Sequence, residues 1–155
     1  MALASTGLPC AITNNSSTAR ANLGELYGTW DPVYGERHWI YIKNTTGGDL
    51  TVGLGVMQKS STALFETTLS AAGTPTIRML GVAAHTISSG NYGFVLARGM
   101  GLVVSNGSTS ANTAQKPVAN GQFADGVVGT DDLPVFALEA QAVGGSTFLA
   151  KINCL

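Results

Sequence analysis

The sequence has 155 residues, only 11% of which are charged, and its formal net charge is −1. That length is typical of a single domain with a buried core. The scattered Lys and Arg residues exclude a surface that binds nucleic acid or an acidic membrane by charge, and no apolar run approaches the roughly 18 residues of a membrane span. A nearly uncharged surface associates readily, which favours a protein whose faces are covered by other subunits.

We expect residues 1–37 to form an extended N-terminal arm. Residues 1–20 are small and polar and show neither helical nor strand periodicity. Residues 21–37 add several large aromatic side chains around Asp31-Pro32, a pair that favours an extended or turn geometry. Because large aromatic residues often anchor interfaces, this segment is either a docking element or a cap on one end of the body. The candidate contact residues are Leu26, Tyr27, Trp30, Pro32, Tyr34 and Trp39.

The body is expected to span residues 38–155, beginning with a strand over residues 38–42 whose two faces are both bulky. A polar turn at residues 44–49 follows. Further strands are predicted over residues 50–57, 63–69 and 76–82, with a Gly- and Pro-containing turn at residues 71–75 before the last of them.

Residues 81–104 are the stretch around which the body is expected to fold. A short apolar strand end at residues 82–84 leads into a polar turn at residues 88–91, and a strand from Tyr92 to Ala97 then continues to Val104. Two strands joined by a Gly/Asn turn indicate a β-hairpin. Gly99 and Gly101 mark a bend, as glycines inside strands commonly do.

The remainder continues the same pattern of short strands and polar turns. A polar loop over residues 105–114 precedes predicted strands at residues 126–129 and 147–152. Residues 135–142 are expected to form either a strand or a single helical turn. Short strands at intervals of about ten residues, separated by Gly, Ser and Asn, predict an all-β fold, either a small β-barrel or a β-sandwich.

The sequence contains few candidate catalytic or metal-binding residues. A Gly-x-Ser-x-Gly nucleophile turn is absent, and His85 is expected to be a hydrogen-bonded residue at a strand end rather than a catalytic base. The soft metal ligands sit at no short ligand spacing, and the aspartates 125, 131 and 132 have an ordinary turn composition. We therefore expect a protein that is not an enzyme and that binds no cofactor or metal. The soft ligands are Cys10, His38, His85 and Cys154.

Cys10 and Cys154 lie near opposite ends of the sequence. A disulfide between them would close almost the whole chain into a loop and stabilise it in an oxidising compartment. Residues 1–10 lack the basic and continuous apolar regions of a secretion signal, so free thiols are the expected state.

Residues 81–99 follow the pattern G-V-A-x-H-x-I-x-S-G-x-Y-G-F-V-x-x-R-G. This pattern, together with residues 43–53 and 137–152, resembles the decoration (cement) proteins of tailed bacteriophage capsids. The resemblance covers roughly residue 38 to residue 155. It implies a small β-barrel or β-tulip domain made in the host cytoplasm and bound to the outer surface of the virion.

The same resemblance implies two partners, the major capsid protein and further copies of this chain, arranged as a homotrimer or less often as a dimer. Such a protein bridges neighbouring capsomers and stabilises the shell against the pressure of the packaged DNA. A head-fibre base or a minor virion protein is the alternative within the same class. A carbohydrate-binding β-sandwich is the alternative from another class, with Trp30, Trp39 and Tyr41 as the stacking rings.

Overall fold

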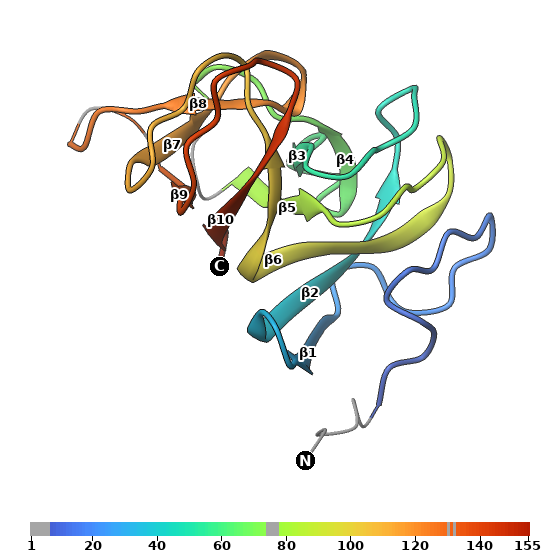
Figure 1. Cartoon of the computed structure of the whole chain (residues 1–155). Coiled ribbons are helices and arrows are strands. Elements are labelled where there is room, and N and C mark those ends of the chain that lie inside the picture. Colours follow the sequence, from blue (N-terminus) through green and yellow to red (C-terminus); the bar gives the residue numbers. More distant parts are fainter. Residues whose placement is uncertain (1–6, 74–77, 130, 132) are drawn as a thin grey trace.

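The computed structural model describes residues 7–73, 78–129, 131 and 133–155, and shows an all-β architecture (Figure 1). Ten strands join in a single mixed sheet, in the order β1-β2-β4-β3-β5-β6-β10-β9-β7-β8. None of the helices among these residues is long and apolar enough to cross a membrane. The elements are β1 (Leu26–Asp31), β2 (Gly35–Asn44), β3 (Gly55–Gln58), β4 (Glu66–Leu69), β5 (Met79–Ala83), β6 (Tyr92–Val104), β7 (Ala114–Pro117), the 3₁₀ turn η2 (Ala119–Gly121), β8 (Phe123–Asp125), β9 (Val135–Ala137) and β10 (Thr147–Asn153).

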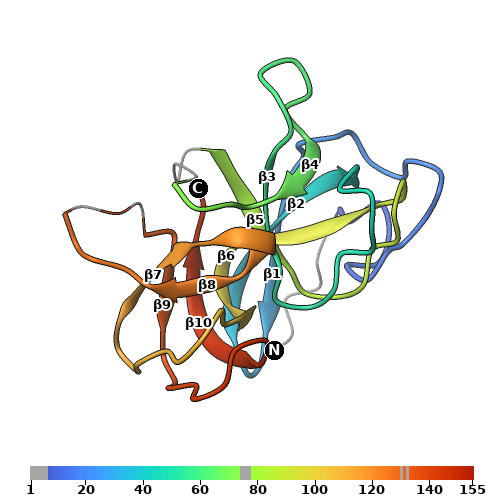
Figure 2. The ribbon, with the colours of Figure 1, turned by 90° about the horizontal axis from the view of Figure 1, so that it is seen from above.

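An additional antiparallel pairing between β2 and β6 closes half of the sheet into a small barrel. The ring runs β2-β4-β3-β5-β6 and returns to β2, and β2 and β4 are parallel neighbours within it. Strand β1 lies outside the ring against β2, whereas β10, β9, β7 and β8 continue from the far half of β6 (Figure 2). The predicted all-β fold is therefore confirmed, and of the two predicted architectures, barrel and sandwich, the closed ring of strands corresponds to the barrel.

Strand β6 connects the two halves of the sheet. Its first half pairs with β2 and β5, and its second half pairs with β10. The strand bends sharply between the halves (Figure 1), at Gly99, whose φ of +120° is rarely adopted by other residues. A Cβ there would lie 2.8 Å from the Glu36 carbonyl oxygen. The expected hairpin is present, with Val82 opposite Leu96.

The two faces of this sheet bury separate cores. One fills the barrel with aliphatic side chains, among them Ile42, Val56 and Val95. The other lies on the opposite face and is built on aromatic residues such as Tyr41, Phe94 and Phe148. Because both faces of β2 and the first half of β6 are covered, their side chains are buried in near-continuous runs, as expected for residues 38–42.

Several predicted strands are shorter in the structure, and one is absent. The predicted strands 50–57 and 63–69 shorten to β3 and β4, because the residues before each form turns. Residues 126–129 form no strand. There the Asp131 carboxylate accepts a 2.8 Å hydrogen bond from the Val127 N–H and closes a turn that leaves Val128 80% exposed. In residues 135–142 only β9 forms a strand, and the predicted strand 76–82 begins at Met79 among the residues described.

The N-terminal segment packs against the body from Leu8 onward. Leu8, Cys10 and Ile12 contact the aromatic core, and Ser16 forms an antiparallel bridge with Tyr92. The Tyr41 hydroxyl accepts a 3.0 Å hydrogen bond from the Arg20 N–H. The predicted arm of residues 1–37 thus includes β1 and the start of β2. A functional division at residue 37 stays a prediction.

Candidate interaction surface

The β1–β2 hairpin carries most of the residues singled out from the sequence. Its turn is held by Asp31, whose carboxylate accepts hydrogen bonds from the Val33 N–H (2.8 Å) and the Tyr34 N–H (3.0 Å). This is the side-chain-to-backbone bonding that makes Asp a frequent turn residue. These two bonds, followed by the charge of Arg37, hold the pKa of Asp31 below its ordinary value.

Arg37 stabilises this turn through an ion pair and contacts with two aromatic rings. Its guanidinium donates to the Asp31 carboxylate at 2.7 Å and lies over two aromatic rings, 5.2 Å from the centre of Tyr34 and 4.9 Å from the centre of Trp39. The Trp39 indole N–H in turn donates to the Thr29 hydroxyl at 2.8 Å. A guanidinium stacked on rings and paired with a carboxylate holds a turn in one geometry.

The hairpin presents apolar side chains to solvent on this rigid base. Leu26 is 53% exposed, Trp30 54% and Val33 74%, and Pro32 beside Val33 is exposed as well. On the other face of β1, Tyr27 packs edge-on against Phe94 with ring centres 5.5 Å apart. An exposed apolar group on an ordered turn is typical of a contact site.

The six candidate residues therefore fall into three groups. Leu26, Trp30 and Pro32 are exposed, and Tyr27 and Tyr34 are half-buried. Trp39 is 2% exposed and belongs to the core. Sequence reasoning missed Val33. The available signal was an aliphatic residue directly after Asp-Pro, in a turn that has no need of one.

The rings proposed for sugar stacking do not form one surface. Tyr41 is fully buried and stacks on Tyr92, with ring centres 6.3 Å apart. Trp39 is buried beneath Arg37, which leaves Trp30 as the exposed ring of the three. A sugar platform needs accessible ring faces, so this arrangement argues against the carbohydrate-binding alternative.

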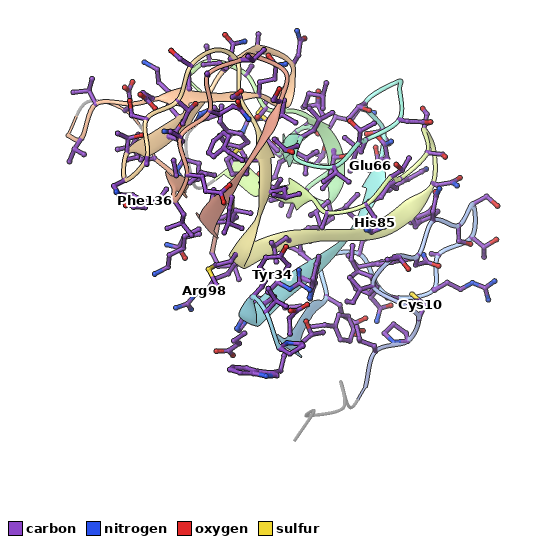
Figure 3. The ribbon with its side chains drawn as sticks, in the orientation of Figure 1. Cys10, Tyr34, Glu66, His85, Arg98 and Phe136 are labelled. Carbon is purple, nitrogen blue, oxygen red and sulfur yellow. The ribbon has the colours of Figure 1, made fainter. Side chains whose placement is uncertain are left out.

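A second feature lies at the bend of β6, where an open cavity of about 350 Å³ is lined by side chains of the hairpin, β6 and β10. His38 pairs with Arg98 across the strands, and the His38 ring lies 3.0 Å from the Glu36 carboxylate. Figure 3 shows Tyr34 and Arg98 at the same end of the molecule. The lining residues are Tyr34, Glu36, His38, Arg98, Gly99, Met100 and Lys151.

The residues considered for catalysis or metal binding lie apart. His85 lies just beyond β5, away from Arg98 (Figure 3), with its Nε2 3.1 Å from the Asn14 carbonyl oxygen, as expected of a hydrogen-bonded residue near a strand end. Burial lowers its pKa. Asp125 accepts hydrogen bonds from Thr113 and Gln115. Asp132 lies outside the described residues, and the described ones contain no group of three metal-ligating side chains.

The two cysteines are free thiols. Cys154 is buried in the aromatic core, where burial raises its pKa to about 12. Cys10 is half-buried on the N-terminal segment, and partial burial raises its pKa as well. The thiolate is the reactive form of cysteine. Because both pKa values are raised, the environments of Cys10 and Cys154 do not favour the thiolate.

Comparison with known proteins gives a match at the level of structure. No family model matches the sequence, and the search of curated proteins finds no match. Among solved structures, the fold is similar to the N base of head fiber gp8.5 of bacteriophage phi29. The TM-score is 0.58 at 12% sequence identity, and the alignment covers 75% of this chain and 93% of that one. At that identity the likeness shows a shared fold.

Proposed function

We propose that this chain is a structural protein of a bacteriophage virion that attaches to the outer surface of the head, as the base of a head fibre. The observation that carries the proposal is the fold shared with the phi29 N base over 93% of that protein. The residue pattern at 81–99, which resembles capsid decoration proteins, supports the same location from an independent source.

The surface chemistry is consistent with a passive structural role. With 11% charged residues, the chain has little charge to keep its faces apart from other proteins. The described residues contain no group of three side chains that could hold a metal ion. The proposed activity is therefore attachment without catalysis, and many weak contacts on one shell would add up through multivalency.

The β1–β2 hairpin is the part that we propose contacts the shell or a neighbouring subunit. Pro32 and Val33 project from a turn that Asp31 and Arg37 hold rigid. A rigid apolar projection loses little entropy when it docks, which favours binding. Residues 1–37 thus remain the proposed docking element, with the exposed Leu26, Trp30 and Pro32 as its leading contacts.

A cement function is the second candidate, and the sequence resemblance favours it. A cement protein bridges neighbouring capsomers and raises the stability of the shell, whereas a fibre base needs only to hold on and to carry another structure outward. The resemblance also implies self-association, as a homotrimer or as a dimer. The major capsid protein is the proposed partner in both cases.

Co-sedimentation with emptied, expanded capsids of the phage that encodes this chain tests attachment. We expect saturable binding at a stoichiometry fixed by lattice sites. Val33→Asp at the hairpin tip should weaken binding at least tenfold. Val128→Asp is the matched control, because this valine is 80% exposed in the turn after β8. Absence of binding by the unmodified protein would refute the proposal, and equal loss in both variants would refute the role of the hairpin.

The temperature at which the shell breaks open distinguishes the two candidates. A cement protein at saturation should raise this temperature by several degrees relative to bare capsids. A fibre base should bind with the same stoichiometry and leave the temperature unchanged.

A further inference from the structure

Strand β1 ends the sheet, and its outer side pairs with no other strand in the part of the chain that the structure describes. Figure 1 shows it at the lower margin of the ribbon, with β2 between it and β6. A strand in that position presents a row of unpaired N–H and C=O groups. The partner that satisfies such a row is another extended chain.

The hydrogen-bond pattern identifies which groups point outward. The Tyr41 N–H donates to the Glu25 carbonyl at 3.1 Å, so Glu25 and Tyr41 occupy a hydrogen-bonded position of the β1–β2 ladder. Antiparallel positions alternate, and the register is unbroken from Leu26 to Asp31. Leu26, Gly28 and Trp30 therefore aim their main-chain N–H and C=O groups away from β2.

This edge lacks the devices that protect other edges. Natural edge strands carry Lys, Pro, an inward charge or a bulge, and positions 26–30 of β1 read Leu-Tyr-Gly-Thr-Trp without any of these. On the face of β1 that is turned to solvent, the large side chains are apolar: Leu26 is 53% exposed and Trp30 is 54% exposed. Both the backbone and the side chains of β1 thus match a second strand with apolar residues at alternate positions.

We propose that the strand that pairs with β1 is β1 of a second copy of this chain, antiparallel about a two-fold axis at Gly28. In this register Leu26 lies opposite Trp30 of the second copy, and Trp30 lies opposite its Leu26. Gly28 faces its own equivalent. All three outward-pointing residues then occupy hydrogen-bonded positions, so the pairing satisfies the edge of both copies at once.

The side chains match in the same register. Each Trp–Leu pair is an apolar cross-strand contact, of the kind that stabilises sheets. No atom lies within 4 Å of the position that a Gly28 Cβ would take, so an indole has room to lie across the dyad. On the other face Tyr27 meets Thr29 of the second copy.

The charges near the contact and its small buried area determine the affinity of this dimer. The register places Glu25 beside Asp31 of the second copy, and Arg37 lies 2.7 Å from the Asp31 carboxylate and offsets the repulsion. The 6 residues of β1 from each copy place the contact at the small end of specific interfaces, below about 1,200 Å². We therefore expect a dissociation constant of about 1–100 μM, and association in solution whether or not the chain binds a capsid.

Analytical ultracentrifugation from about 1 to about 200 μM covers that range of affinity. We expect a monomer–dimer equilibrium that Gly28→Pro abolishes, because proline removes the outward N–H and places a ring on the edge. Gly28→Ala keeps the N–H and is the matched control. Leu26→Lys places a charge on the exposed face, and its dissociation constant should rise at least tenfold. Circular dichroism establishes that each variant is folded.

Gly28→Cys tests the register itself. Residues at a hydrogen-bonded antiparallel pair have Cα atoms about 5.5 Å apart, within disulfide range. Mild oxidation should therefore join the introduced thiol of one copy to the same thiol of the other. Gly48→Cys, at another open glycine, should not cross-link. Peptide mapping separates the new bond from any that involves Cys10 or Cys154.

Three results would overturn the proposal. The first is a monomer throughout the concentration range, and the second is a trimer, since an isologous two-fold contact closes with two copies. The third is a dimer that Gly28→Pro and Leu26→Lys leave intact. A chain that dimerises only after residues 1–6 are deleted would place its own first residues on the edge, which also contradicts the proposal.

Discussion

Asp31 and Arg37 are joined by a 2.7 Å ion pair across the β1–β2 turn, and the same guanidinium covers the rings of Tyr34 and Trp39. The pair connects the exposed end of the hairpin to the aromatic core, because Trp39 is 2% exposed. A turn held in this way presents Pro32 and Val33 in one fixed arrangement. The apolar tip is therefore held in place by the fold. The proposed capsid contact and the proposed pairing of β1 both use this hairpin.

Asp31→Asn should loosen this turn without unfolding the chain. We expect a lower urea midpoint at neutral pH, because the amide keeps an acceptor for the turn but loses the ion pair with Arg37. The pKa of Asp31 is lowered from 3.8 in the folded state, so its contribution to stability is present above pH 3.8 and lost as the pH falls through the folded pKa. The difference between the two proteins should accordingly shrink as the pH falls below 3.8 and through the lowered pKa of Asp31. A difference that persists there would contradict an electrostatic origin.

Asn44→Ala should reduce the free energy of unfolding by about 2–4 kcal/mol, since it orphans buried polar groups. The Asn44 amide N–H₂ donates at 2.8 Å to the carbonyls of Gly48 and Ile87, and its oxygen accepts from Thr46. Asn44 is fully buried. Asn106→Ala, at an exposed side-chain hydrogen bond, should cost less than about 1 kcal/mol. Urea unfolding followed by circular dichroism measures both, and equal effects would contradict the role given to this network.

Gly81→Ala should be among the most damaging single substitutions in the barrel. A Cβ at position 81 would lie 2.6 Å from the Leu96 carbonyl oxygen, and the φ of Gly81 is +155°. Since the obstacle is backbone, relief requires β5 to move away from β6, at a cost of about 3 kcal/mol or more. Gly48→Ala has open space and is the control. A thermal midpoint that drops equally in both variants would show that β5 and β6 are not packed so closely.

The two free cysteines should differ in reactivity. Cys154 is buried with its pKa raised to about 12, whereas Cys10 is half-buried. At pH 8 a thiol reagent should modify Cys10 at least tenfold faster than Cys154, since the thiolate is the reactive form. Both should react at similar rates in urea. Peptide mass mapping measures the two rates, and fast labelling of Cys154 in the folded protein would contradict the packing of the last strand.

The all-β fold and the central place of residues 81–104 could be predicted because both follow from local patterns. Alternating apolar residues between Gly and Asn turns identify strands wherever they occur, and glycine at position 99 marks the bend of β6. The closure of the barrel was not predictable in the same way. The β2–β6 pairing joins residues about 50 to 60 positions apart, and strand patterns carry no information on which strand meets which.

The location of the candidate site could be predicted from the sequence, but which residues form its exposed surface could not. Large aromatics around Asp-Pro indicated the hairpin, yet composition alone does not tell which rings face solvent. Trp30 is exposed and Trp39 is buried because they lie on opposite faces of adjacent strands. That distinction depends on the cross-strand register, in which Trp30 faces Glu36 and Trp39 faces Tyr27.

Electron cryo-microscopy of expanded capsids incubated with the purified protein tests attachment to the phage head most directly. We expect density for this β-fold on the outer surface of the shell, at repeated lattice sites, with the β1–β2 tip toward the capsid. Capsids without added density, or density confined to the interior, would contradict the proposed function. Density with the tip pointing away from the shell would keep the function and refute the proposed contact.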